Sequence, residues 1–247
     1  KSDLKLLNTI NEKIELLEKI GIDNLIIHPF DEKFAESNAE EFVSTILVDQ
    51  LRVQKIIIGY DHRFGKNRTA NIDDLISFGT QYGFEVEQIS AQEIDEISIS
   101  STKIRTALEE GDIQLANEYL GYRYFLSGTV VKGKQLGRTI GFPTANISLE
   151  EDYKLVPQNG VYVVRAEIDG KTIYGMMNIG FNPTVQGKKK TIEVHLFDFD
   201  SDIYNCKIQV SILQRIRSEK KFESVEVLKE QLKKDKTFSL DYLNQIE

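Results

Sequence analysis

The hydrophobic and polar positions of this chain follow two rhythms, one up to about residue 121 and another after it. In the first part, apolar residues recur at intervals of three and four, as at Leu4, Leu7, Ile10, Ile14 and Leu17. Residues at these intervals share one face of a helix. The spacing therefore predicts a helix over residues 4–20, and Gly21 follows it as an expected C-cap.

Short apolar runs separate the helical segments of the first part. The runs at 24–27, 55–59 and 84–89 predict strands, and the unbroken run at 55–59 is typical of a strand covered on both faces. Helices are expected between and after them: one beginning with a capping box at Ser37 and Glu40, then 73–82, and two segments over about 97–121. Strands that alternate with helices predict a parallel, doubly wound α/β sheet.

After residue 122 the pattern becomes that of a β protein. Five runs separated by polar or glycine-containing turns predict strands, at 125–133, 160–170, 171–180, 189–199 and 206–216. Asp169 and Gly170 supply the residues that favour a tight hairpin turn. Short strands at this spacing favour an antiparallel barrel or sandwich, and a final helix is expected over 224–243. We therefore expect two domains, 1–121 and 122–247.

The composition is that of a globular protein and limits the expected cellular compartment and the expected types of stabilising site. Of 247 residues, 40% are hydrophobic, which suffices for a core. The single Cys206 excludes a disulfide within the chain, and three scattered histidines do not favour a zinc site. The sequence contains neither a membrane-length apolar run nor the apolar segment of a signal peptide. These features predict a protein of the reducing cytoplasm without a membrane partner.

Charge is distributed unevenly along the chain. The formal net charge is −8, but residues 1–122 hold 12 basic and 23 acidic side chains, whereas the remainder holds 19 and 16. A net negative chain argues against non-specific binding of nucleic acid. The asymmetry suggests two units with different chemistry. Nothing in the pattern indicates an oligomeric state.

The segment 128–147 carries the most distinctive candidate chemistry. It combines glycines with cations and ends in Pro143, Thr144 and Asn146. Glycines allow backbone N–H groups to approach phosphates, and two oxygen-bearing side chains two residues apart suit Mg²⁺. The expected phosphate-binding residues are Gly128, Gly133, Lys134, Gly137 and Gly141. By composition alone, a glycine-rich hairpin with solubilising cations is somewhat favoured over a nucleotide site.

Four ordered motifs resemble those of riboflavin kinases and cover about residues 122–245. The first runs from Gly128 to an intact Pro-Thr-Ala-Asn at 143–146. The second places Asn178, Gly180, Pro183 and Thr184 in an N-x-G-x-x-P-T pattern. The third is E-x-H-x-F-D-F from Glu193 to Phe199, and the fourth is R-x-E-x-K-F from Arg217 to Phe222. The resemblance implies an antiparallel β-barrel with a C-terminal helix that converts riboflavin to FMN with ATP and Mg²⁺.

The resemblance also assigns roles to residues. It implies that Glu193 is the catalytic base, that Thr144 and Asn146 meet the metal, and that Asn178 and Arg217 contact the flavin. Strand alternation places Glu193 and His195 on one face, expected inside the barrel or at its rim. A solvated glutamate on an edge strand is the alternative for Glu193. A structural role is favoured for His195.

Two motifs of the first part resemble the FMN adenylyltransferase domain that is fused to bacterial riboflavin kinases. The segment 100–105 matches a signature at a helix start, so Ser100, Ser101, Thr102 and Arg105 are expected to bind nucleotide phosphates. An ordinary Ser/Thr helix cap is the alternative. The loop 59–65 also matches, which implies a flavin site at Asp61 and Phe64. Phe64 stacks on the ring or anchors the loop.

One departure from that family limits the expectation. The family's His-x-Gly-His motif is absent from these 247 residues, and the chain begins at Lys1. We therefore expect an incomplete Rossmann-like nucleotidyltransferase domain that forms FAD only when complete. The alternatives are a monofunctional riboflavin kinase with a degenerate first domain, or a flavin-binding regulatory protein without catalysis. The expected small molecules are riboflavin, FMN and ATP.

Overall fold

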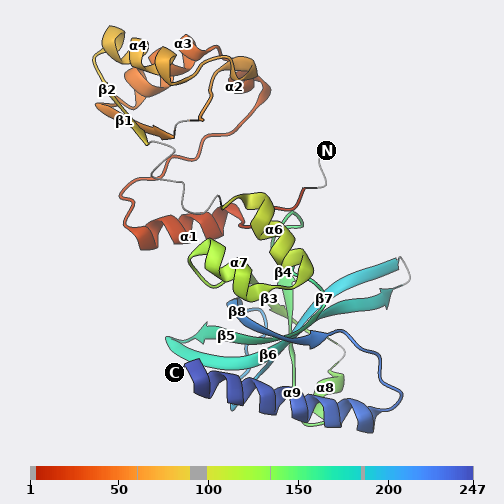
Figure 1. Ribbon diagram of the computed structural model, residues 1–247. Helices are drawn as coiled ribbons and strands as arrows, with labels where there is room; N and C mark the ends of the chain where they lie inside the picture. Colours follow the sequence, from red (N-terminus) through yellow and green to blue (C-terminus); the bar gives the residue numbers. More distant parts are fainter. Residues whose placement is uncertain (1–3, 60, 90–98, 134, 185–186, 247) are drawn as a thin grey trace. The chain divides into compact units, whose positions relative to one another are not determined.

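The computed structural model describes residues 4–59, 61–89, 99–133, 135–184 and 187–246, which form two compact units (Figure 1). One unit is the single segment Asp23–Ser98. The other joins Lys1–Ile22 to Ile99–Glu247. By packing, the helices near residues 10–20 and 101–120 therefore group with the β-rich part. The expected domain boundary between residues 121 and 122 follows the motifs rather than this packing and stays a prediction.

Six antiparallel strands close into a barrel in the larger unit (Figure 1). Neighbouring strands follow the order β3-β4-β7-β6-β5-β8. Their bounds are β3 Phe125–Val131, β4 Ala145–Leu149, β5 Gly160–Ile168, β6 Lys171–Thr184, β7 Gly187–Leu196 and β8 Lys207–Ser218. The expected barrel class is confirmed, and the sandwich alternative is wrong.

The sequence pattern missed strand β4. Its five residues include Asn146 and Ser148, so no apolar run marks it. Its neighbours β3 and β7 supply the backbone hydrogen bonds that hold it in the barrel. The β5–β6 hairpin, in contrast, forms as expected, with Asp169 and Gly170 at φ of 51° and 71°. Those positive angles are the geometry for which an Asp-Gly turn was predicted.

The two faces of the barrel wall pack against different partners. One set of alternate residues fills the interior, for example Leu126, Tyr162, Met177, Val194 and Ile212. The opposite set meets helix α9 (Val225–Ile246), which lies along the outside of the barrel (Figure 1). The apolar residues of this outer layer include Val161, Val163, Met176, Phe197 and Leu213 from the barrel, with Leu228, Leu232 and Leu243 from α9.

Three further helices complete this unit: α1 (Ile10–Ile20), α6 (Ser101–Glu110) and α7 (Ile113–Leu120). Buried residues of α6 and α7 extend the barrel core. Helix α1 starts at Ile10 rather than near residue 4, because Thr9 and Glu12 form a capping box that defines its first turn. Before the helix, the Leu6 amide donates to the Tyr153 carbonyl at 2.7 Å and the Leu6 carbonyl accepts from the Leu155 amide at 2.8 Å.

The smaller unit is a short parallel α/β structure. Strands β1 (Lys55–Gly59) and β2 (Glu85–Ile89) pair in parallel, as expected. Helices α2 (Glu32–Ala35), α3 (Ala39–Glu41) and α4 (Ile72–Tyr82), the π-helix η1 (Phe42–Gln50) and the 3₁₀ turn η2 (Lys66–Arg68) accompany them. The core is Val43, Ile58, Phe64, Ala70, Leu75 and Phe84.

Three local expectations for this unit are wrong. Residues 24–27 form no strand, and Ile26 is 62% exposed, because no neighbouring strand pairs with this run within the described residues. Ile57 of β1 is 61% exposed, so this strand is not covered on both faces. The capping box lies at Asn38 and Glu41, one residue later than expected, since the Asn38 side chain accepts from the Glu41 amide.

Candidate active site

A single row of paired residues links most of the expected kinase residues across five strands. Asn146 of β4 lies opposite Glu193 of β7, which lies opposite Asn178 of β6. Asn178 in turn pairs with Val161 of β5, and Val161 pairs with Arg217 of β8. Directly paired residues project to the same face of a sheet. Residues that are far apart in the sequence therefore share one belt on the barrel wall.

This belt lies on the outer face of the barrel, beneath α9. Ile192, Val194 and Leu196 belong to the interior core, whereas Phe197 packs in the layer that contains α9 residues. The predicted alternation along β7 is therefore confirmed. Of the two places expected for the polar and aromatic face, inside the barrel or at its rim, the inside is wrong, because bulky aliphatic side chains already fill the interior.

Glu193 is half-buried and contacts the Pro-Thr-Ala-Asn segment directly. The Thr144 hydroxyl donates to Glu193 Oε2 at 3.4 Å. His195 Nδ1 lies 2.8 Å from the Pro143 carbonyl oxygen, which can only accept, so Nδ1 carries the proton. The His195 ring lies 5.3 Å from the ring of Phe142 and 5.7 Å from that of Phe197, and its burial lowers its pKa. These contacts suit a neutral histidine that holds Pro143 in place.

An apolar cavity of about 250 Å³ covers the belt. Its polar side chains are Thr144, Asn178, Glu193 and His195, with Arg217 near the end of β8 and Glu219 and Lys220 just after it. Its apolar lining comes from Ile140, Phe142, Val161, Met176, Phe222, Leu228 and Leu232. A mostly apolar pocket with a few directed polar groups is typical of a site for a planar organic ring.

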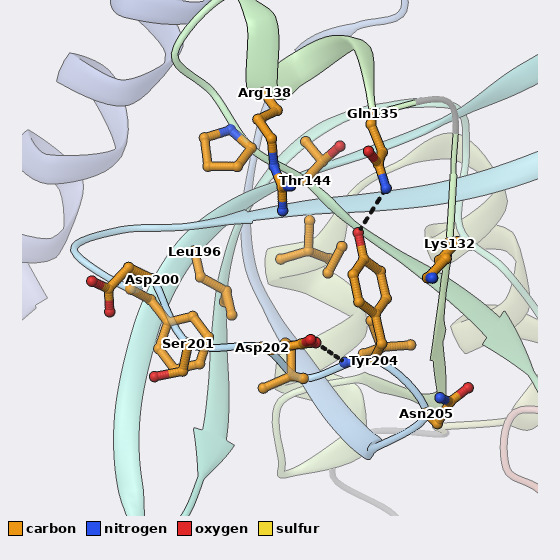
Figure 2. Close-up of a pocket in the computed structure, with 16 residues that line it drawn as sticks. Lys132, Gln135, Arg138, Thr144, Leu196, Asp200, Ser201, Asp202, Tyr204 and Asn205 are labelled. Atoms are coloured by element: carbon orange, nitrogen blue, oxygen red, sulfur yellow. Dashed lines mark hydrogen bonds between the residues drawn. The ribbon is translucent and has the colours of Figure 1, made fainter.

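A second, larger cavity of about 940 Å³ meets the same threonine (Figure 2). Lys132 and Arg138 provide its positive charge, and Asp200 and Asp202 lie on the opposite loop. Tyr204 accepts a hydrogen bond from the Gln135 side chain at 3.4 Å. Thr144 lines both cavities, so the Thr144–Glu193 contact lies where they meet.

The glycines of 128–141 have packing reasons of their own. A Cβ on Gly137, in the short helix α8 (Leu136–Thr139), would overlap the Phe142 carbonyl oxygen, and one on Gly133 would overlap the Asn146 side chain. Gly128 lies against the Ser148 backbone in the barrel wall, and Gly141 has a φ of +83°. These contacts shape the segment around Asn146, and phosphate binding by the glycines stays a prediction. Lys134 lies outside the described residues.

The oxygen atoms around Glu193 fit a magnesium ion that accompanies a nucleotide. Thr144, Asn146 and Glu193 offer a hydroxyl, an amide and a carboxylate, which are hard ligands. The absence of a Cβ at Gly133 leaves the Asn146 amide its place beside this group. Across the described residues, no cluster of three or more His, Cys, Asp or Glu side chains forms a cage. Such a sparse set suits Mg²⁺, which takes few protein ligands and completes its shell with phosphates and water.

The adenylyltransferase-like motifs occupy both units and are described separately. Ser100 caps α6, where its side chain accepts from the Lys103 amide at 3.2 Å, and Ser101 and Thr102 are exposed at the helix start. The Arg105 Nε donates to the Lys5 carbonyl at 3.0 Å. In the smaller unit Phe64 is buried against Phe42, which favours the loop-anchor role over flavin stacking. Asp61 is exposed.

Comparisons with known proteins support both the riboflavin kinase and the adenylyltransferase resemblance. A riboflavin kinase family model matches residues 120–243, and a FAD synthetase model matches residues 1–103. A bifunctional riboflavin kinase/FMN adenylyltransferase of Bacillus subtilis is 39% identical over 98% of this chain and 76% of its own length. A protein of the same name from Buchnera aphidicola is 41% identical over 100% and 80%. The chain belongs to the bifunctional riboflavin kinase/FMN adenylyltransferase family.

A solved structure gives the same fold. A Streptococcus pneumoniae chain described as a macrolide-efflux protein superposes with a TM-score of 0.84 at 35% identity, over 94% of this chain and 75% of that one. Within the described ranges of the present chain, no helix combines the length and the apolar character of a membrane span. The fold class expected from the sequence, a nucleotidyltransferase-type region followed by a barrel kinase, is confirmed for this family member.

Sequence reasoning missed the contribution of α9 to the site. Leu228 and Leu232 line the apolar cavity, and the Asp235 carboxylate binds the Arg217 guanidinium. The partial apolar stripe of the predicted helix signalled that one face packs on the barrel. It gave no sign of which strand that face would meet, because the partner lies on β8 and the pairing is purely tertiary.

Proposed function

We propose that the barrel unit transfers the γ-phosphoryl group of MgATP to the 5′-hydroxyl of riboflavin and so forms FMN. The observation that carries this proposal is the Thr144–Glu193 contact at the junction of the two cavities. The larger cavity, with Lys132 and Arg138 in its wall, suits the nucleotide, and the apolar one suits the isoalloxazine ring. In this arrangement the ribityl chain extends from the apolar cavity toward Glu193.

In the proposed reaction, Glu193 removes the proton from the ribityl 5′-hydroxyl as that oxygen bonds to the γ-phosphorus. The bond from the γ-phosphorus to the bridging oxygen breaks, and ADP leaves. Thr144 and Asn146 would hold Mg²⁺, which when bound offsets negative charge on the phosphates. Lys132 and Arg138 add positive charge to the cavity wall, and His195 keeps Pro143, and hence Thr144, in position.

The second proposed activity, which requires a complete nucleotidyltransferase domain, is adenylyl transfer from ATP to FMN, which yields FAD. Its support is the family membership and the helix start at Ser100, where Ser101 and Thr102 are exposed in the first turn of α6. Asp61 in the smaller unit is the proposed flavin contact of this reaction. The reducing cytoplasm remains the proposed compartment.

Chromatography of the products tests both activities. Purified chain is incubated with riboflavin and MgATP, and FMN should accumulate. The 247 residues contain no His-x-Gly-His sequence, so FMN rather than FAD is the expected main product of this polypeptide. Riboflavin binding without any FMN would favour the alternative of a flavin-binding regulatory protein.

A further inference from the structure

Asp235 is a deeply buried charge beside the candidate site, and the proposed mechanism does not use it. Its side chain is 1% exposed, on the face of α9 that meets the barrel. The Arg217 Nε donates to its two oxygens at 3.0 and 3.1 Å, and Nη2 donates to Oδ2 at 2.7 Å. A bidentate pair of this kind fixes both the position and the plane of a guanidinium group.

Asp235 is also held in place by neighbours on its own helix. Gln231, one turn earlier on α9, donates to Asp235 Oδ1 at 2.9 Å, and Ser239, one turn later, donates to the Asp235 backbone carbonyl at 2.8 Å. The helix is also anchored to the barrel by apolar contacts of Leu228, Leu232 and Leu243. The anchoring of α9 therefore does not depend on a buried charge, which is costly to desolvate and is often replaceable by apolar residues.

The contact with Asp235 fixes the position of the Arg217 guanidinium, which is a positive charge on the wall of the apolar cavity. Arg217 lines that cavity and shares the belt with Asn178 and Glu193. A guanidinium has five N–H donors. Within the described residues, Asp235 accepts hydrogen bonds from the single N–H of Nε and from one N–H of Nη2. The Ser218 carbonyl accepts from one N–H of Nη1 at 3.1 Å. One donor on each terminal nitrogen is left for a ligand. The Phe222 ring lies 5.6 Å from Arg217 Cζ.

We infer that Asp235 is a positioning residue for riboflavin: through its bidentate contact it holds Arg217 so that the two remaining donors meet hydrogen-bond acceptors of the flavin. The inference rests on the proposed kinase function. Riboflavin offers ring carbonyls and ribityl hydroxyls as acceptors, whereas the nucleotide is assigned to the other cavity. Loss of the carboxylate should therefore weaken flavin binding and leave nucleotide binding intact.

The test compares Asp235→Asn with a control on the same helix. Asp235→Asn keeps the shape but removes the charge, and the KM for riboflavin should rise roughly tenfold, the scale of one charge-assisted hydrogen bond. The KM for MgATP should stay within about twofold. The control is Glu230→Gln, whose carboxylate pairs with Lys233 on the exposed face of α9 and should change neither constant. Thermal melts establish that each variant is folded.

A double variant separates positioning from general support of the fold. In an Arg217→Met background, where riboflavin affinity is already reduced, Asp235→Asn should cause no further loss. An equal further loss there, or an unchanged riboflavin KM in the folded single variant, would overturn the inference. If Asp235→Asn does not fold, Asp235→Glu decides instead, because it keeps the charge but displaces the carboxylate and should still raise the riboflavin KM.

The same experiment distinguishes failure of the inference from failure of the proposed function. A wild-type chain that forms no FMN from riboflavin and MgATP would overturn the kinase proposal. Riboflavin affinity, measured by quenching of flavin fluorescence without ATP, would then still show whether Asp235 acts through Arg217.

Discussion

At the scale of single residues, the proposed chemistry depends on a carboxylate that meets a hydroxyl across two segments of the chain. Glu193 is half-buried, and its Oε2 accepts from Thr144 at 3.4 Å. Its neighbours along β7, Ile192 and Val194, point into the barrel core and fix the strand. The carboxylate therefore has a defined position beside the Thr144 hydroxyl.

Replacement of Glu193 by glutamine tests its role as the base. The amide keeps the size of the side chain and can still accept from Thr144, so the barrel should remain folded. The loss of a positioned base should lower kcat for riboflavin phosphorylation by about 10² to 10⁴. Steady-state kinetics with riboflavin and MgATP give this value, and a fall of less than tenfold in a folded variant would remove Glu193 from the mechanism.

Thr144→Ala and Asn146→Ala test the metal–phosphate assignment. Each removes one oxygen donor, so MgADP should bind more weakly and kinase turnover should fall with it. Titration calorimetry with and without Mg²⁺ is the measurement, since the effect should shrink when the metal is absent. If both variants bind MgADP with wild-type affinity, residues 143–146 form a structural turn and do not bind the metal or the phosphates.

At the scale of elements, the sequence reveals those parts of the barrel in which local patterns dominate. Alternation in β7 and the Asp169–Gly170 turn are local properties, and both were predicted. Strand β4 was missed because its place depends on pairing with β3 and β7, which lie far away in the chain. The run at 24–27 shows the converse, because apolar residues without a pairing partner form no strand.

The candidate site divides in the same way. Family motifs indicated Asn146, Asn178, Glu193 and Arg217, and the strand register places these four on one wall. The side of the wall was not predictable from alternation alone, since period two separates the faces but does not say which one is inside. The partnership of Arg217 with Asp235 required the packing of α9, which no local pattern specifies.

The first turn of α1 is joined by a buried ion pair to the segment between β4 and β5. Lys154 Nζ lies 2.6 Å from Glu12 Oε2 and donates to the Leu7 carbonyl at 2.7 Å, and both side chains are 1% exposed. The Lys154 ammonium also lies 4.3 Å from the ring centroid of Tyr124. Burial lowers the pKa of Lys154 from 10.5 to about 8, although Glu12 opposes the shift.

This pKa predicts a pH dependence of stability. Between about pH 8 and 10.5 the unfolded chain holds a proton on Lys154 that the folded chain has released, so the free energy of unfolding should rise with pH in this window. Each pH unit fully within the window contributes up to about 1.4 kcal/mol. Urea unfolding of wild type and of the double variant Glu12→Gln, Lys154→Met gives the difference. A difference that is flat or falls with pH would contradict the lowered pKa.

At the scale of the whole molecule, the two compact units do not coincide with two consecutive stretches of sequence. The smaller unit, Asp23–Ser98, is inserted between two parts of the larger one. The first part, up to Ile22, pairs with residues 153–155 through Leu6 and contributes Glu12 to the buried ion pair. The proposed kinase residues, in contrast, all lie after residue 122. A fragment chosen from the motifs alone would therefore omit part of the unit that carries them.

Replacement of residues 23–98 by a flexible Gly/Ser linker tests this organisation. The shortened chain keeps both parts of the larger unit, so it should fold cooperatively and phosphorylate riboflavin with a kcat within about threefold of the full chain. A matched fragment that begins at residue 99 lacks the partners of Lys154 and of the 153–155 backbone. It should melt at a lower temperature, because a buried charge that loses its partner typically costs about 3–5 kcal/mol. Calorimetry and FMN formation are measured on both proteins. Equal melting temperatures would show that residues 1–22 add nothing to the barrel. Loss of FMN formation in a folded linker variant would show that the smaller unit takes part in the kinase reaction.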